Sequence, residues 1–211
     1  MLTINKYVVN SGEQWDIVIE GMRNPMNSWN KSDSGWDDNA QYTIGDADLT
    51  LMRNLAHAGS DHRKFMRMVP VFITITAPLY WWKEFDTYKV GTVANSCSTM
   101  HKIHEKEFTL DDFSHDHLAP IAIDQLNNTI DVLNFYRNIY NQDKSKSAWY
   151  SIIQLLPSSY NQRRTVFLNY ETLHNIYRAR RNHKLTEWHT FCDFIRTLPH
   201  SELITGEAIN T

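Results

Sequence analysis

Basic side chains that gather in the last third of the chain carry the strongest chemical signal. An arginine guanidinium binds phosphate through paired hydrogen bonds, so clustered arginines favour a phosphorylated ligand. The formal net charge of the chain is -3 at pH 7, which makes a basic cluster distinctive. A solvated helix face is the simpler alternative for part of this set. Its members are Arg163, Arg164, Arg178, Arg180, Arg181 and Lys184.

Residues 69–102 combine large aromatic and short polar side chains. Trp81, Trp82 and Phe85 follow Pro78, and a polar run over 92–99 comes next. This mixture suits a ligand pocket, and a buried polar helix interface is an equal alternative. Together with the arginine cluster, it favours an aromatic phosphorylated ligand such as a nucleotide.

Cys97 offers a different chemistry. It lies near His101 and His104 in the sequence, so a thiolate nucleophile is one hypothesis and an inert thiol is the simpler one. A cysteine-dependent transferase therefore stands as a minor alternative function.

Histidines and carboxylates in the segment 107–117 are a weak metal signal. His115 and His117 accompany Asp112 and Asp116, but a His-x-His pair without a third matched ligand does not predict a site. We expect no metal. The chain also lacks the GxGxxG, GxxxxGK[ST], HExxH and GxSxG motifs of common enzyme classes.

Composition limits the class of protein. The length of 211 residues fits a single domain over 1–211, and 42% hydrophobic content supports a genuine core. A slightly acidic balance argues against a general nucleic-acid binder. Two cysteines indicate a reducing cytoplasm, and no apolar run has the length of a membrane span or a signal peptide. We therefore expect a cytoplasmic protein without nucleic-acid or membrane partners.

Hydrophobic periodicity predicts an α+β fold with several helices and few strands. Strands are expected at 2–9, 69–78 and 165–168. Helices are expected after a capping box at Ser11, after Asp46 as N-cap, after Pro78, and over 118–141, 147–156 and 185–198. Residues 26–45 are expected to be a long loop and 200–211 a loosely attached tail.

The order of these elements resembles the flavin-dependent thymidylate synthases, over about residues 46–198. In that family a helix ends in a Gly/His turn and a strand finishing in Ala-Pro follows, as in LAHAGSDHRKFMRMVPVFITITAP here. Leu156-Pro157, then TVFLN and Leu173, match a later Leu-Pro, an aromatic strand and Asn-x-x-x-Leu. Arg181 precedes Trp188 by the spacing of the family's phosphate-binding Arg and its Gln-Trp.

The signature helix of that family is rewritten in this chain. Glu84 stands where the family has Gln, and Thr87-Tyr88-Lys89 replaces Arg-His-Arg, so only Lys89 keeps a positive charge there. Thr92 replaces a Ser. Of the family's Asn-Glu-x-Ser-x-Arg-Tyr, only Asn95 and Ser98 are retained.

The resemblance implies a site for each kind of ligand. His62 falls where a flavin-contacting histidine is usual, and Glu84 would face a pyrimidine or act as an acid/base. The implied residues are Glu84 and Ser98 as catalytic, His62, Tyr88, Lys89 and Asn95 as cofactor-binding, and Arg163, Arg164 and Arg181 as nucleotide-binding.

The resemblance also implies an activity. It is flavin-dependent methyl or one-carbon transfer to a dUMP-like pyrimidine deoxynucleotide, with FAD as cofactor and NADPH and methylenetetrahydrofolate as candidate co-substrates. The implied fold is a small antiparallel sheet with several packed helices, and the implied assembly is a homotetramer with sites between subunits. The alternative is a non-catalytic nucleotide-binding or protein-interaction protein on the same fold, which Trp29 and Trp36 in the long loop favour.

Overall fold

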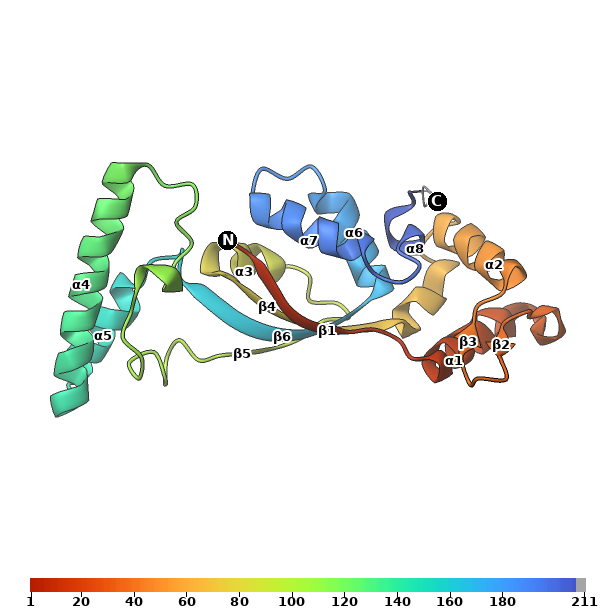
Figure 1. Cartoon of the computed structure of the whole chain (residues 1–211), viewed down its shortest axis with the longest axis horizontal. Coiled ribbons are helices and arrows are strands. Elements are labelled where there is room, and N and C mark those ends of the chain that lie inside the picture. The colour runs from red at the N-terminus through yellow and green to blue at the C-terminus, as the bar shows by residue number, and fades with distance from the viewer. Residues whose placement is uncertain (208–211) are drawn as a thin grey trace. The chain divides into compact units, whose positions relative to one another are not determined.

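The structure is a computed structural model that describes residues 1–207 (Figure 1). It confirms an α+β fold, in which a small antiparallel sheet of four strands in the order β1-β4-β6-β5 accompanies several helices. The strands are β1 (Thr3–Val8), β4 (Pro70–Pro78), β5 (Val93–Ser96) and β6 (Asn161–Asn169).

The chain divides into two compact units. Unit 1 comprises Met1–Asn5, Thr74–Thr87 and Asn95–Thr165, and unit 2 comprises Lys6–Ile73, Tyr88–Ala94 and Val166–Thr211. The organisation of 1–211 as one domain stays a prediction.

The strand-to-helix junction at Pro78 organises unit 1. Helix α3 (Leu79–Phe85) begins directly after β4, with Pro78 as its N-cap. Trp81, Trp82 and Phe85 are almost fully buried. The aromatic run is therefore core rather than the wall of an open ligand pocket, and α3 ends before the rewritten segment 87–89 begins.

A helical pair completes unit 1. Helices α4 (Pro120–Asp143) and α5 (Lys146–Leu155) lie side by side, as Figure 1 shows. The helix predicted over 118–141 is confirmed as α4, and its apolar residues join one cluster with the segment before the helix. That cluster contains Ile103, Phe108, Phe113, Leu126, Ile130, Leu133 and Ile152.

Helices at both ends of the chain build unit 2. They are α1 (Gly12–Arg23), α2 (Asp46–His57), α6 (Tyr170–Arg180), α7 (Thr186–Arg196) and α8 (Glu202–Thr205). The capping box predicted at Ser11 is confirmed, with Gln14 Oε1 accepting the Ser11 N–H at 3.0 Å. The loosely attached tail predicted after Pro199 is wrong as far as residue 207. Leu203 and Ile204 are buried, and Glu202 pairs with Arg53 at 3.0 Å.

The segment 26–45 is more ordered than the predicted loop. It contains an antiparallel pair, β2 (Gly35–Trp36) and β3 (Tyr42–Thr43). The Asp48 carboxylate of α2, fully buried, anchors it by accepting hydrogen bonds from Ser32 and Ser34 and from Arg23 Nε at 2.6 Å. Burial opposes the ionisation of Asp48, but these hydrogen bonds prevail and lower its pKa to about 2.

The start of α2 differs from the predicted N-cap at Asp46. Gly45 is the N-cap, and it has no capping side chain. The carboxylate of Asp33 instead accepts the N–H groups of Ala47 at 2.8 Å and Asp48 at 3.0 Å. A residue distant in sequence therefore does the capping, which local spacing does not reveal.

Candidate functional site

The predicted site residues fall in both units. Unit 1 holds Glu84 on α3, Asn95 on β5, Ser98 just after it, and Arg163 and Arg164 on β6. Unit 2 holds His62, Tyr88, Lys89 and Arg181.

Arg164 is enclosed by partners within unit 1. Its guanidinium lies 4.4 Å from the centre of the Trp82 ring, and its Nη1 donates to Asp86 Oδ1 at 2.8 Å. Its Nε donates to Gln162 Oε1 at 2.9 Å, and only 14% of the side chain is exposed. Its charge is thus already compensated by a carboxylate, which disfavours the phosphate-binding role predicted for it.

Arg163 has the opposite environment. Successive residues of a strand face opposite sides, so Arg163 points away from the face that carries Arg164. Its side chain is exposed, and its backbone carbonyl accepts the Cys97 N–H at 3.0 Å. Of the two neighbouring arginines, Arg163 is the one available to an anionic ligand.

Ser98 lies in a tight turn after β5. Its Oγ accepts the backbone N–H groups of Met100 at 3.1 Å and His101 at 2.8 Å. Because the oxygen already serves as an acceptor twice, its remaining capacity is the hydroxyl proton. Ser98 can therefore donate one hydrogen bond to a ligand.

Tyr88 replaces a histidine of the family signature and is held by Arg180 in unit 2. Arg180 Nε donates to the Tyr88 hydroxyl at 2.8 Å. The guanidinium also lies 5.5 Å from the centre of the Tyr88 ring and 4.8 Å from that of Trp188. Arg180 is thus a basic partner of the rewritten segment 87–89.

The residues after Tyr88 are fixed against the start of α6. Thr172 Oγ1 donates to the Val90 carbonyl at 3.2 Å. Gly91 has φ of +75°, and a Cβ there would lie 2.9 Å from both Asn169 Nδ2 and Thr172 Oγ1. Only glycine suits that position. The exposed Lys89 lies between these two attachments.

Asn169 is part of the match to the family, and here it caps α6. Its Oδ1 accepts the Thr172 N–H at 2.9 Å, and only 7% of the residue is exposed. The Asn-x-x-x-Leu spacing therefore also has a purely structural explanation, because Leu173 is fully buried on the same helix.

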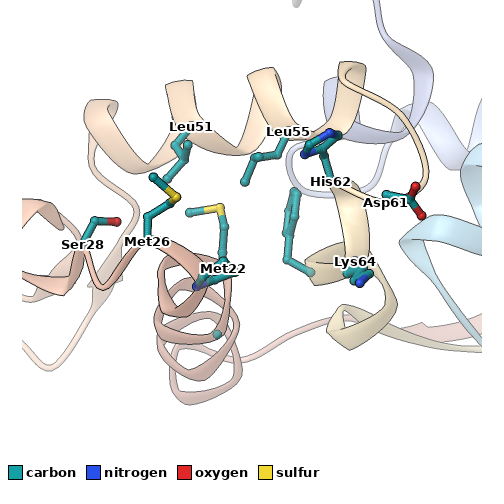
Figure 2. A pocket seen from close by; sticks show the side chains of 11 residues that line it. Met22, Met26, Ser28, Leu51, Leu55, Asp61, His62 and Lys64 are labelled. Atoms are coloured by element: carbon teal, nitrogen blue, oxygen red, sulfur yellow. The ribbon is translucent and has the colours of Figure 1, made fainter.

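His62 borders a cavity of about 390 Å³ in unit 2. Its walls are mostly apolar, with Met22 of α1 and Leu51 and Leu55 of α2 among them. Figure 2 shows these side chains facing a common space, with His62 and Lys64 to one side. The volume lies within the range of small-molecule pockets, and His62 supplies a polar group at its edge.

Arg181 follows α6 and has an exposed side chain. Lys89 and Arg163 are exposed as well, and within residues 1–207 neither of them forms an ion pair. Each of these cations, taken by itself, is a donor of the kind that a nucleotide phosphate or the diphosphate of FAD requires, so the chemistry of the donors fits such groups.

Glu84, the predicted acid/base, is half-buried on α3. Its backbone carbonyl accepts the Thr87 hydroxyl at 2.8 Å, which closes the helix C-terminus. Its catalytic role stays a prediction.

The weaker candidates have ordinary partners. His115 Nδ1 lies 2.9 Å from the Phe113 carbonyl, and Asp112 caps Thr109 and pairs with Lys106. Across the described part of the chain, no group of three or more His, Cys, Asp or Glu side chains is placed to hold a metal. Cys97 is exposed and Cys192 is buried, and both thiols are free.

Two functional candidates were missed by sequence reasoning. Arg180 was counted in the basic cluster but given no role, and Gln162 was not singled out. The available signal was that Arg163–Arg164 and Arg180–Arg181 are adjacent pairs in the sequence, because adjacent side chains point in different directions. In the structure, one member of each pair is exposed and the other is partly buried.

Solved structures share this fold along almost the whole chain. Thymidylate synthase X from Helicobacter pylori, crystallised with FAD and dUMP, has a TM-score of 0.64 at 15% identity, and the match covers 98% of this chain and 96% of that protein. A second structure with FAD and dUMP from the same organism has a TM-score of 0.61 at 15% identity, with 98% and 97% covered.

A third structure is named for a methylation. It is the UMP/dUMP methylase PolB from Streptomyces cacaoi bound with 5-Br dUMP, with a TM-score of 0.61 at 11% identity, covering 93% of this chain and 88% of that one.

This chain has the fold of the flavin-dependent thymidylate synthases. The resemblance inferred from the sequence is thereby confirmed for the fold, in a strongly diverged sequence. No protein-family model matches the chain, and no curated protein matches it in sequence. Within residues 1–207, no helix has both the length and the apolar character needed to cross a membrane.

Proposed function

We propose that this protein binds a pyrimidine deoxynucleotide such as dUMP and catalyses a flavin-dependent methyl or one-carbon transfer to its base. The observation that supports this most is the full-length likeness to thymidylate synthase X and also to a UMP/dUMP methylase. Two differently named proteins with the same fold were crystallised with dUMP or a bromo derivative of it. A nucleotide shared by two differently named proteins of this fold favours a ligand that goes with the fold.

The nucleotide phosphate would be held by Arg181 and Arg163, with Ser98 and Lys89 as further donors. Arg163 and Arg181 expose their guanidinium groups, and the turn at Ser98 leaves its proton for a ligand oxygen. Charge-assisted hydrogen bonds of this kind give both affinity and orientation. Glu84 would face the pyrimidine or serve as an acid/base.

The flavin side would be formed by His62, Tyr88 and Asn95, with Lys89 for the diphosphate. When bound, FAD would supply the redox chemistry. The chain's own residues would bind and orient the two ligands. NADPH and methylenetetrahydrofolate are proposed as co-substrates on the basis of the resemblance.

We also propose a homotetramer with sites between subunits. Val90 is 91% exposed and Val93 is 67% exposed, although both flank predicted ligand-binding positions. Burying apolar surface of this kind against another copy would be favourable. Size-exclusion chromatography with light scattering tests the assembly of the purified protein, and a monomer at micromolar concentration would contradict it.

A second candidate is a nucleotide-binding protein without catalysis. The specific observation in its favour is the engagement of Tyr88 by Arg180, at a position where the family signature has a histidine. On this hypothesis the protein binds dUMP but has no turnover.

The test is the ligand content and activity of the purified protein. A flavin absorption spectrum, dUMP binding by calorimetry and dUMP-dependent NADPH oxidation would support the proposed enzyme. Binding of dUMP without flavin and without turnover would favour the second candidate. A purified protein that binds neither flavin nor dUMP would contradict both candidate functions.

Matched arginine variants locate the phosphate site. Arg181→Ala should weaken dUMP binding by about tenfold or more, because a charged hydrogen bond to phosphate is lost. Arg178→Ala removes another exposed arginine of the same region and should leave the affinity unchanged. Equal effects of the two variants would contradict the assignment of Arg181.

A further inference from the structure

We propose that Arg164 is a positioning residue: it holds the end of strand β5 against β6 through Gln162, and so places Asn95 and Ser98, instead of binding the nucleotide itself. The placement of those residues rests on the proposed function, whereas the hold on the strand does not. Both parts concern unit 1 alone.

The first step is the enclosure of Arg164. Asp86 Oδ1 accepts a hydrogen bond from its Nη1 at 2.8 Å, and the guanidinium carbon lies 4.4 Å from the centre of the Trp82 ring. A phosphate would have to compete with the carboxylate that already compensates this charge. Arg164 is thus committed to its neighbours, in contrast to the exposed Arg163.

Arg164 fixes the orientation of the Gln162 side chain, and Gln162 is only 6% exposed. A glutamine amide can be rotated by half a turn at little steric cost, so its partners decide which end accepts and which donates. Arg164 has no acceptor, so its Nε requires the oxygen of Gln162 at 2.9 Å. The amide nitrogen is thereby directed to the other side.

The third step joins Gln162 to the edge strand. Its Nε2 donates to the Cys97 carbonyl at 2.8 Å, while the Cys97 N–H donates to the Arg163 carbonyl at 3.0 Å. The backbone carbonyl of Gln162 also accepts the Trp82 indole N–H at 2.9 Å. Both backbone groups of Cys97 are therefore tied to β6.

The fourth step is the weakness of β5 without this attachment. The strand covers only Val93–Ser96, lies at the edge of the sheet, and has exposed side chains throughout. Short edge strands with little burial open readily. An additional side-chain hydrogen bond at Cys97, immediately before Ser98, is consequently a substantial part of what holds this segment.

Hydrogen exchange at the Cys97 amide tests the hold on the strand and needs no ligand. Arg164→Met keeps the aliphatic part of the side chain but removes the guanidinium and its donors, and it should speed exchange about tenfold. Gln162→Met should have a similar effect, and the double variant should add little because both act on one bond. Arg163→Met is the exchange control and should leave the rate unchanged.

Unchanged exchange in Arg164→Met, with folding verified by circular dichroism, would overturn the proposal. If that variant does not fold, Gln162→Met and Arg164→Lys decide. Lysine can pair with Asp86 but lacks the planar fork that holds Gln162, so exchange should still accelerate. Exchange at the unaltered rate in both of these variants would equally overturn the proposal.

Affinity for dUMP separates positioning from direct phosphate binding. Positioning predicts equal losses in Arg164→Met and Gln162→Met, and no recovery in Arg164→Lys. Direct binding predicts a loss in Arg164→Met alone, with recovery in Arg164→Lys, and would overturn the positioning role. If the wild-type protein does not bind dUMP, the proposed function fails, while the exchange result still decides the hold on β5.

Discussion

Two arginines that lie over aromatic rings hold different parts of the chain. Arg164 in unit 1 covers Trp82, pairs with Asp86 and connects through Gln162 to the edge strand. Arg180 in unit 2 covers Trp188 and donates to Tyr88, at the start of the rewritten segment. Each is more enclosed than the arginine next to it in the sequence.

In each pair of adjacent arginines, one side chain is enclosed by neighbouring residues and the other is exposed. On strand β6, alternation places Arg163 and Arg164 on opposite faces. At the end of α6, the helical rotation places Arg180 toward Trp188 and leaves Arg181 in solvent. In both pairs the enclosed member stabilises a segment of backbone and the exposed member is free to meet an anion.

A third enclosed arginine, Arg23, should contribute the most to the free energy of unfolding, because it and its carboxylate partner are both buried. Arg23 is paired with the fully buried Asp48 at 2.6 Å. Asp48→Ala should lower the free energy of unfolding by about 3–5 kcal/mol, because a buried cation loses its partner. Urea unfolding measures this. Asp131→Ala, at an exposed position of α4, is the control, and an equal loss there would contradict the assignment.

Acid should weaken the same pair. The folded pKa of Asp48 is about 2, below the ordinary value of about 3.9, so its contribution is complete above the ordinary pKa and is lost as pH falls toward the folded one. We expect a loss of about 2 kcal/mol between about pH 5 and pH 2. Thermal melts across this range, compared with Asp48→Asn, measure it. An identical pH slope in the variant would exclude Asp48 as the cause.

Arg164 and Arg163 should differ in stability. Arg164→Ala should cost about 1–2 kcal/mol, because it removes a cation–π contact and hydrogen bonds at a partly exposed carboxylate. Arg163→Ala should stay within about 0.5 kcal/mol, since its side chain is exposed. Chemical denaturation of both variants decides, and equal costs would break the division proposed for the pair.

Tyr88 should show a smaller effect than Arg164. Tyr88→Phe removes the hydroxyl that accepts from Arg180 and keeps the ring, so it should cost about 1 kcal/mol. Tyr42→Phe is a suitable comparison because the hydrogen bond of its hydroxyl to Asp16 is long, at 3.3 Å. A cost for Tyr88→Phe no greater than that of Tyr42→Phe would show that Arg180 does not anchor the segment.

Much of the fold was accessible from local patterns. The capping box at Ser11, the strand predicted at 69–78 and the helix predicted at 118–141 were correct, because each depends on residues close in sequence. The cap of α2, the anchored segment 26–45 and the buried end at Ile204 were not. In each case the deciding partner lies far along the chain, such as Asp33 for Ala47 or His174 for the Ile204 carbonyl.

The candidate site divides in the same way. Residue types and spacing by themselves indicated a phosphate-binding set of arginines and an α+β fold. The resemblance of the strand ending in Ala-Pro and of the later motifs then implied the fold of the flavin-dependent thymidylate synthases, which the solved structures confirm. Only the tertiary structure decided which arginines are enclosed, because Trp82, Asp86 and Gln162 reach Arg164 through folding and not through sequence proximity. A charged side chain reveals what it can bind, whereas its neighbours in space determine what it is free to bind.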